Sequence, residues 1–289
     1  MSSILSRQDR LQLEEELGRG SYATVYKATL NVAVMRVHRL LLDYARQSRE
    51  DYEKVVRDFK RECDLLEIAK HPNIIRFIGV HEVDGEPALV MELLDQSLDE
   101  YIVGSKRKGG LPLTKQIDIC TQIAHGLAFL HQFDPQILHR DLRTKSILVN
   151  IDCALVKISD LGQAKFRPSD VNYLTTQAPG CILYMPPEAL DEDNPKFTSR
   201  GDVFSFGVVM LEVGTQAGPS CGVQKIGSKP EVERRARDLS KLPDDHPLKL
   251  IILQCLRDNH KERPDIETVK VKLLMKYSLI AEPMRKVCY

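Results

Sequence analysis

Two aspartates in separate short motifs are the residues best suited to chemistry. Asp141 lies in "LHRDLRTKSILV", where the polar Ser146 follows five residues later and an apolar run comes next. Asp160 lies in "KISDLGQA", after an apolar run and shortly before a glycine. One carboxylate can accept a proton from a hydroxyl while the other holds a divalent cation against phosphate oxygens. A lone aspartate is usually a turn former, but two in this order favour a catalytic pair.

A glycine-rich stretch, "GRGSYATV", precedes both aspartate motifs. Gly18 and Gly20 carry no side chain, so the backbone there can approach phosphate oxygens and point its N–H groups at them. Taken alone, this stretch fits a plain hairpin equally well. Its position upstream of the two aspartates is what favours a phosphate-binding loop.

Composition limits the classes of protein that the chain can belong to. The 289 residues are 43% hydrophobic, enough for one large domain or two lobes. Lys+Arg and Asp+Glu both total 41, which gives no reason to expect nucleic acid or a membrane surface as partner. The seven cysteines lack CxxC pairs, which argues against a zinc site or a disulfide framework. Without an apolar signal region or a run of ~18 apolar residues, we expect a cytoplasmic protein with no membrane span.

The elements that must position these residues change character along the chain. Residues 11–37 predict antiparallel strands, residues 50–70 a helix, and residues 71–94 two strands around a turn at Asp84 and Gly85. Helical patterns recur at 114–133, 202–213, 247–256 and 265–275, and residues 216–230 are expected to form an exposed loop. We therefore predict an α+β fold, with a β-rich part over 1–94 (including a short extension, 1–10) and a mainly helical part over 95–289.

In this order the motifs make the chain resemble a protein kinase domain from about Leu13 to Leu274. The landmarks are the glycine loop at 18–25, "AVM" at 33–35, Glu62 before "HPNI", the hinge "VMELL", HRD at 139–141, "DLG" at 160–162, "YMPPE" at 184–188, "DVFSFG" at 202–207 and "ERP" at 262–264. The style of "HPNIIRFIG" and "DVFSFGVVMLE" is similar to the tyrosine-kinase-like group. The resemblance implies a bilobal fold, ATP and Mg²⁺ as cofactors, and a protein substrate or allosteric protein partner.

The resemblance also implies roles for single residues. Asp141 would be the catalytic base, Asp160 the Mg²⁺ ligand, and Glu62 the acidic partner of a strand lysine. Arg143 stands where Ser/Thr kinases usually carry a phosphate-contacting lysine and some tyrosine kinases carry arginine. The residues that would surround the nucleotide, with Met91 as gatekeeper, are Gly18, Gly20, Val25, Ala33, Met91, Glu92, Leu94 and Leu148.

Two further implications concern stability and control. Glu188 and Arg263 would form a buried ion pair in the large lobe. Arg140 beside the catalytic aspartate implies control by phosphorylation of the segment 163–183. The candidate hydroxyls there are Ser169, Tyr173, Thr175 and Thr176.

The strand that should carry the lysine departs from the family pattern, because Met35 occupies its position. Side chains alternate along a strand, so if Ala33 and Met35 face the nucleotide, Arg36 faces away unless a bulge brings it round. Lys27 shares a face with Val25 but lies away from the phosphates. The glycine-loop position from which some kinases supply a lysine is Ala23.

Other departures bear on the reaction. Ser146 replaces a metal-binding asparagine and is expected to be a weak ligand, and Cys181 replaces a threonine that commonly bonds the catalytic aspartate. Losing one preorganised charge typically costs ~10²–10³ in rate, although such losses are rarely additive. Fast turnover is therefore not expected. Without its lysine, Glu62 is expected to turn outward or to find an arginine or water.

Three hypotheses follow from the sequence. The first is a nucleotide-binding domain, a pseudokinase or weak kinase, with phosphoryl transfer to protein hydroxyls weak or absent and Ser/Thr favoured by "YMPPE". The second is a working Ser/Thr kinase that is seen as a lysine-to-methionine inactivated variant or that uses an unorthodox cation. The third is an interaction module that binds no nucleotide. The sequence specifies neither a substrate nor an oligomeric state.

Overall fold

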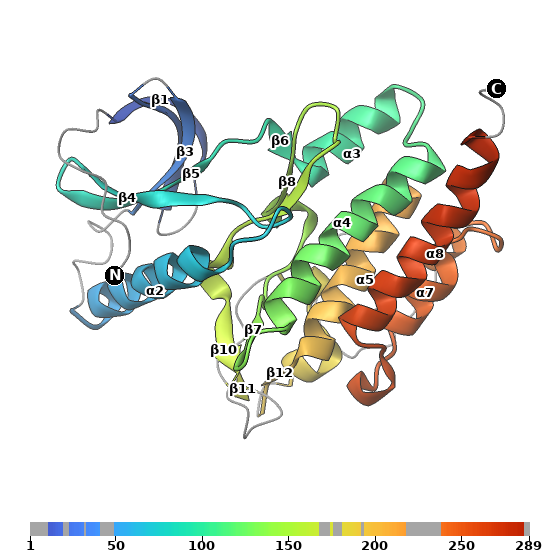
Figure 1. Cartoon of the computed structure of the whole chain (residues 1–289). Coiled ribbons are helices and arrows are strands. Elements are labelled where there is room, and N and C mark those ends of the chain that lie inside the picture. The colour runs from blue at the N-terminus through green and yellow to red at the C-terminus, as the bar shows by residue number, and fades with distance from the viewer. Residues whose placement is uncertain are drawn as a thin grey trace. The chain divides into compact units, whose positions relative to one another are not determined.

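The computed structural model describes residues 11–19, 23–31, 33–40, 49–167, 174–175, 181–191, 194–217 and 238–285. The chain divides into two compact units. The described residues up to Asp95 form the first together with Asp160–Gly162, and the second comprises Gln96–Ser159 with the described residues from Gln163 onward. Strands dominate the first unit and helices the second (Figure 1), which confirms the predicted α+β kinase-type fold.

The first unit contains one antiparallel sheet of five strands in the order β1-β2-β3-β5-β4 and one long helix. The strands are β1 (Leu11–Arg19), β2 (Ala23–Leu30), β3 (Ala33–Leu40), β4 (Phe77–Val83) and β5 (Glu86–Glu92). The helix is α2 (Arg49–Ile68). The predicted turn at Asp84 and Gly85 is confirmed, and both residues have positive φ, 51° and 78°.

A two-residue turn between β2 and β3 fixes the register of the sheet. Leu30 pairs with Ala33, and Asn31 in the turn has a φ of 57°, a conformation that asparagine tolerates. The ladder continues without a shift, and its pairs include Ala28 with Met35 and Val25 with His38. Directly opposite residues of an antiparallel pair share a face of the sheet, so this turn decides which β3 residues share a face with Val25.

One face of this sheet is closed by an apolar cluster. Its buried members are Ala28, Leu30, Val37, Ala88 and Val90. Met35 packs against this cluster from β3, as do Leu11 and Leu13 from β1. The packing of Met35 against this cluster agrees with the strand register, which places Met35 directly opposite the buried Ala28.

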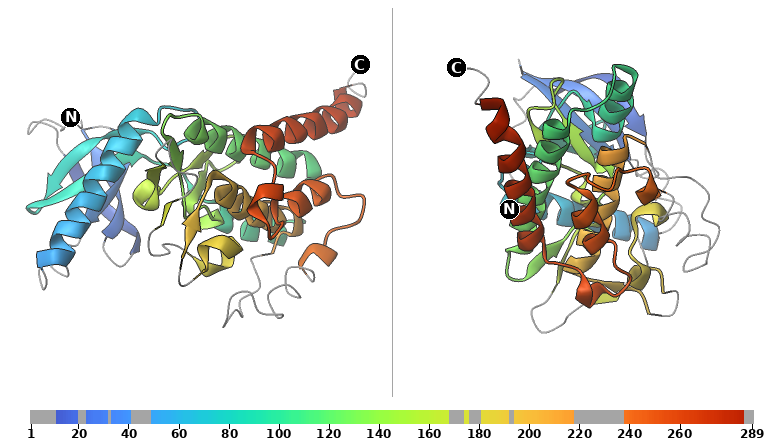
Figure 2. Two further views of the ribbon diagram at one scale, coloured as in Figure 1. Left: turned by 90° about the horizontal axis from the view of Figure 1, so that it is seen from below. Right: turned by 90° about the vertical axis from the view of Figure 1, so that its right-hand side faces the viewer.

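The second unit is built on helices. They are α3 (Leu98–Arg107), α4 (Leu113–His131), α5 (Ser199–Thr215), α7 (Lys249–Cys255) and α8 (Ile266–Arg285). Helix α4 packs against α8, and α5 against α7 (Figure 2). All residues from Gly201 to Val213 of α5 are buried, so this helix is the centre of the unit.

Short strands and single helical turns connect these helices. The strands are β6 (Gln96–Ser97), β7 (Gln136–Leu138), β8 (Ile147–Val149), β9 (Val156–Ile158), β10 (Lys165–Arg167), β11 (Leu174–Thr175) and β12 (Lys196–Phe197). Strand β8 pairs with β6 and β9, and β7 pairs with β10. Within the part of the chain that the structure describes, every helix is too short or too polar to cross a bilayer.

Candidate functional site

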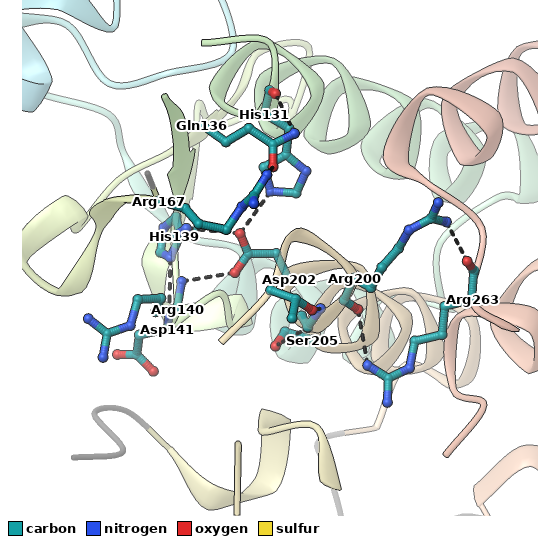
Figure 3. Close-up of polar contacts among 12 residues, drawn as sticks. His131, Gln136, His139, Arg140, Asp141, Arg167, Arg200, Asp202, Ser205 and Arg263 are labelled. Carbon is teal, nitrogen blue, oxygen red and sulfur yellow. Dashed lines mark hydrogen bonds and ion pairs between the residues drawn. The ribbon is translucent and has the colours of Figure 1, made fainter. Parts of the chain in front are cut away.

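The loop that carries Asp141 is anchored by Asp202, from the first turn of α5. The carboxylate of Asp202 accepts hydrogen bonds from the backbone N–H groups of His139 and Arg140, both at 2.9 Å (Figure 3). Nε2 of His131 lies 2.8 Å from the same carboxylate. Burial alone would raise the pKa of Asp202, but the hydrogen bond with His131 and the positive surroundings bring it below its ordinary value. Asp202 is therefore an ionised anchor for this loop.

The carboxylate of Asp141 is oriented by two neighbours in the second unit. Oδ1 accepts a hydrogen bond from the backbone N–H of Cys181 at 3.1 Å. Oδ2 lies 3.4 Å from Nε of Arg143, so the structure brings these two predicted site residues together. Cys181 stands where kinases commonly have a threonine that bonds the aspartate, so the sequence predicted that this bond is lost. The backbone N–H of Cys181 nevertheless donates a hydrogen bond to Asp141.

Ser146 is almost fully buried, at 1% exposure, and its hydroxyl forms hydrogen bonds with the backbone of its own loop. Oγ accepts from the N–H of Arg143 at 3.0 Å and lies within donating distance of the carbonyl oxygens of Asp141 and Arg143. The carbonyl of Ser146 accepts from both the N–H and the hydroxyl of Ser159. Ser146 thus connects the loop to the strand before Asp160, while its role as a weak metal ligand stays a prediction.

Glu62 and Asp160 converge on Gly162 in the first unit. A Cβ placed on Gly162 would lie 3.3 Å from Oε2 of Glu62, which is tight, and in ordinary contact with Oδ1 of Asp160 at 3.6 Å. Nη2 of Arg61 donates to the carbonyl of Gly162 at 3.5 Å. The structure therefore places the predicted Mg²⁺ ligand beside the predicted acidic partner.

The surroundings of Glu62 affect its protonation. Burial, with the nearby charge of Asp160, raises the pKa of Glu62 to about 8, and Arg61 offsets only part of this. Among the described residues Glu62 forms no hydrogen bond or ion pair, and its side chain stays partly buried beside Gly162. That Glu62 turns outward or finds an arginine or water in place of the strand lysine stays a prediction.

Met35 does not face the side of the sheet that was expected. Because the β2–β3 turn pairs Met35 with Ala28, Met35 and Val25 lie on opposite faces, and Met35 packs into the apolar cluster. Val25 and Met35, both of which the resemblance would place at the nucleotide, therefore do not share a face of the sheet. The reason is the two-residue turn, which motif spacing does not reveal.

The residues predicted to surround a nucleotide are distributed over both units. In the first unit Gly18 pairs with Val25, and Met91 and Leu94 are buried. The N–H of Glu92 donates to the carbonyl of Arg76 at 3.0 Å. In the second unit Leu148 is buried in β8. Gly20, Ser169, Tyr173 and Thr176 lie outside the described residues, and for Ala33 and Thr175 only the backbone is described.

Arg140 and Arg263 both have defined partners in the second unit. The guanidinium of Arg140 lies over the ring of Phe197, 4.3 Å from its centroid, and donates to the carbonyl of Gln163 at 3.4 Å. Arg263 forms a two-pronged ion pair with Glu188, with N–O distances of 2.7 and 2.8 Å. The predicted Glu188–Arg263 pair is confirmed. Phosphorylation control through Arg140 stays a prediction.

A buried polar network that the sequence did not reveal involves Thr144, in the loop that carries Asp141. The hydroxyl of Thr144 donates to Glu212 at 2.9 Å and lies 3.1 Å from the hydroxyl of Tyr184. Burial, offset in part by the bonds from Tyr184 and Thr144, raises the pKa of Glu212 to about 7. The signal for this network was an acidic residue within the apolar sequence of α5, where a buried carboxylate must find partners.

Replacing Glu212 by glutamine is expected to change how stability depends on pH. The native pKa lies above that of the unfolded chain, so the unfolded state loses its proton first and the wild type loses stability as pH rises from about 4.5 to about 7. The Glu212→Gln variant lacks this loss and should gain about 3 kcal/mol on the wild type between pH 5 and pH 8. Urea unfolding at both pH values measures the difference, and parallel profiles would contradict it.

Comparison with known proteins places this geometry in a family context. The profile of the family described as protein tyrosine and serine/threonine kinase matches residues 11–273. The chain is 26% identical to calmodulin-binding receptor-like cytoplasmic kinase 3 of Arabidopsis thaliana over 94% of its length and 56% of that protein. It is 30% identical to the G-type lectin S-receptor-like serine/threonine-protein kinase RKS1 of the same plant, over 94% of this chain and 34% of the relative. The chain therefore spans about half or less of these relatives' lengths.

Proposed function

Because the chain belongs to the protein tyrosine and serine/threonine kinase family, we propose that it binds ATP with Mg²⁺ and transfers the γ-phosphoryl group slowly to serine and threonine hydroxyls of proteins. The anchored position of Asp141 carries this proposal. Its loop is fixed by Asp202, and its carboxylate is aimed by Cys181 and Arg143. Such a carboxylate is suited to accept the proton of an attacking hydroxyl.

The residues present fit a divalent cation with phosphate ligands. Asp160 would supply the hard oxygen ligand that Mg²⁺ prefers, and the carboxylate of Glu62 lies beside the same glycine, Gly162. Bound Mg²⁺ would neutralise charge on the phosphate groups. Asp160 would hold the ion, while Asp141 would receive the proton.

Transfer is expected to be slow because the chain lacks two residues of the family pattern, the strand lysine and the metal-binding asparagine. Met35 brings no positive charge and packs with apolar side chains, and the hydroxyl of Ser146 is engaged in its own loop. Each missing group typically costs a factor of ~10²–10³, so a residual rate is expected rather than efficient turnover. Because phosphoryl transfer is expected to be slow, the proposal also includes a role as a scaffold or allosteric regulator of a protein partner.

The preference for serine and threonine is supported by relatives. RKS1 and a probable kinase of Dictyostelium discoideum, 26% identical over 95% of this chain, are both named serine/threonine-protein kinases. We extend that preference, and a cytoplasmic location for the domain, to this chain as part of the proposal.

Incubation with γ-labelled Mg-ATP and a mixture of serine, threonine and tyrosine peptides tests the proposal. We expect slow label transfer to serine and threonine, abolished by chelation of Mg²⁺. Label on tyrosine alone would contradict the hydroxyl preference. No transfer above that of the Asp141→Asn variant would contradict catalysis and leave the scaffold role.

A further inference from the structure

The register of β3 assigns its two neighbouring residues to opposite faces of the sheet. Met35 is paired with Ala28 and Glu92, whereas the backbone of Arg36 is paired with Lys27 and Met91. Neither ladder has a shift between these pairs, so no bulge is needed to bring Arg36 to the face of Met91. This reverses the expectation from the sequence, in which Arg36 was the residue that faces away.

The two faces differ in what covers them. The face of Met35 is closed by the apolar cluster around Ala28 and Val90, and no described residue of α2 belongs to that cluster. Helix α2 packs against β4, beside which it lies in Figure 1, and it buries Cys63, Leu65 and Leu66. Helix α2 therefore covers the other face, which carries the fully buried Met91 and the backbone position of Arg36.

The same helix carries Glu62, whose carboxyl lies close to Asp160. A Cβ placed on Gly162 would lie 3.3 Å from Oε2 of Glu62 and 3.6 Å from Oδ1 of Asp160, so two carboxylates meet beside this one glycine. Two carboxylates so close together favour a basic residue on the α2 side of the sheet. Of the two β3 neighbours, only Arg36 is basic, and only its register position is on that side.

We propose that Arg36, and not Met35, is the strand cation of this kinase domain, acting towards Glu62 and the phosphate groups of ATP. The inference rests on the proposed function and deepens it. A guanidinium is planar and spreads its charge over several donors, so it replaces a strand lysine imperfectly. The residual phosphoryl transfer then depends on Arg36.

Binding measurements on purified variants test the proposal without relying on activity. We expect Arg36→Ala to weaken Mg-ATP binding by about 10- to 100-fold, because a charge-assisted contact is lost, and to leave adenosine binding unchanged. The Arg36→Lys variant should retain most of the ATP affinity. Arg39→Ala is the matched control, because Arg39 pairs with Thr24 and Ala88 on the opposite face.

The Met35→Lys variant separates the two candidate positions. We expect this variant to unfold at a lower temperature, because the new ammonium group enters the apolar cluster, and to gain no ATP affinity. Tighter ATP binding by Met35→Lys, or equal ATP binding by Arg36→Ala and the wild type, would overturn the inference. If neither the wild type nor Arg36→Lys bound ATP at millimolar concentration, the proposed function itself would fail.

Discussion

Replacing Asp141 by asparagine should lower the rate of phosphoryl transfer by a factor of about 10²–10⁴, because the amide cannot accept the proton of the attacking hydroxyl. The amide oxygen can still accept the N–H of Cys181, so the loop and the nucleotide affinity should be preserved. Single-turnover transfer at saturating Mg-ATP measures the loss directly.

Asp152 provides the matched control for this substitution. It is an exposed aspartate in the same unit, and its carboxylate caps the N–H of Ala154 in a turn. Asp152→Asn removes the same charge and should leave the transfer rate unchanged. If Asp141→Asn kept the wild-type rate, Asp141 would not be the base and the observed transfer would come from another group.

Replacing Arg263 by methionine should destabilise the second unit by about 3–5 kcal/mol, because Glu188 is left with a desolvated, unpaired charge. The side chain of Arg263 is 0% exposed and that of Glu188 only 11%. Nε of Arg263 also donates to the carbonyl of Arg257, which loses its partner in the variant. Urea unfolding at neutral pH measures the change in the free energy of unfolding.

The double variant Arg263→Met with Glu188→Gln should recover part of this loss, because no charge remains buried. The exposed pair of Arg257 and Glu262, 3.8 Å apart, is the control. Breaking that pair with Glu262→Gln should cost no more than about 1 kcal/mol. Equal losses at the buried and exposed pairs would show that desolvation does not control the stability of the Glu188 pair.

Periodicity and turn residues predicted most elements but not all of their extents. The pattern at 114–133 corresponds to α4, whereas α8 runs to Arg285, ten residues beyond its predicted end. Helix α3 was missed, although Ser97 and Glu100 form a capping box at its start. Only Leu98 and Ile102 of its ten residues are buried, so its apolar pattern gave a weak periodic signal.

The face of β3 could not be predicted from motif spacing. Matching "AVM" to a family motif assigns Met35 by order along the chain, but a two-residue and a three-residue turn differ by one residue in register and exchange the two faces. The choice depends on Asn31 adopting a positive φ. Asp202 was placed within a landmark motif, yet its function as the anchor of the loop that carries Asp141 could be seen only from the three-dimensional contacts.

Titration of the unmodified protein with Mg-ATP, followed by calorimetry and thermal unfolding, tests the central claim most directly. The account predicts one binding event that stabilises the protein by about 2.7 kcal/mol at a ligand concentration one hundred times Kd. Chelation of Mg²⁺ should weaken it. Absence of both binding heat and stabilisation at millimolar Mg-ATP would contradict the claim that this chain is a nucleotide-dependent kinase domain.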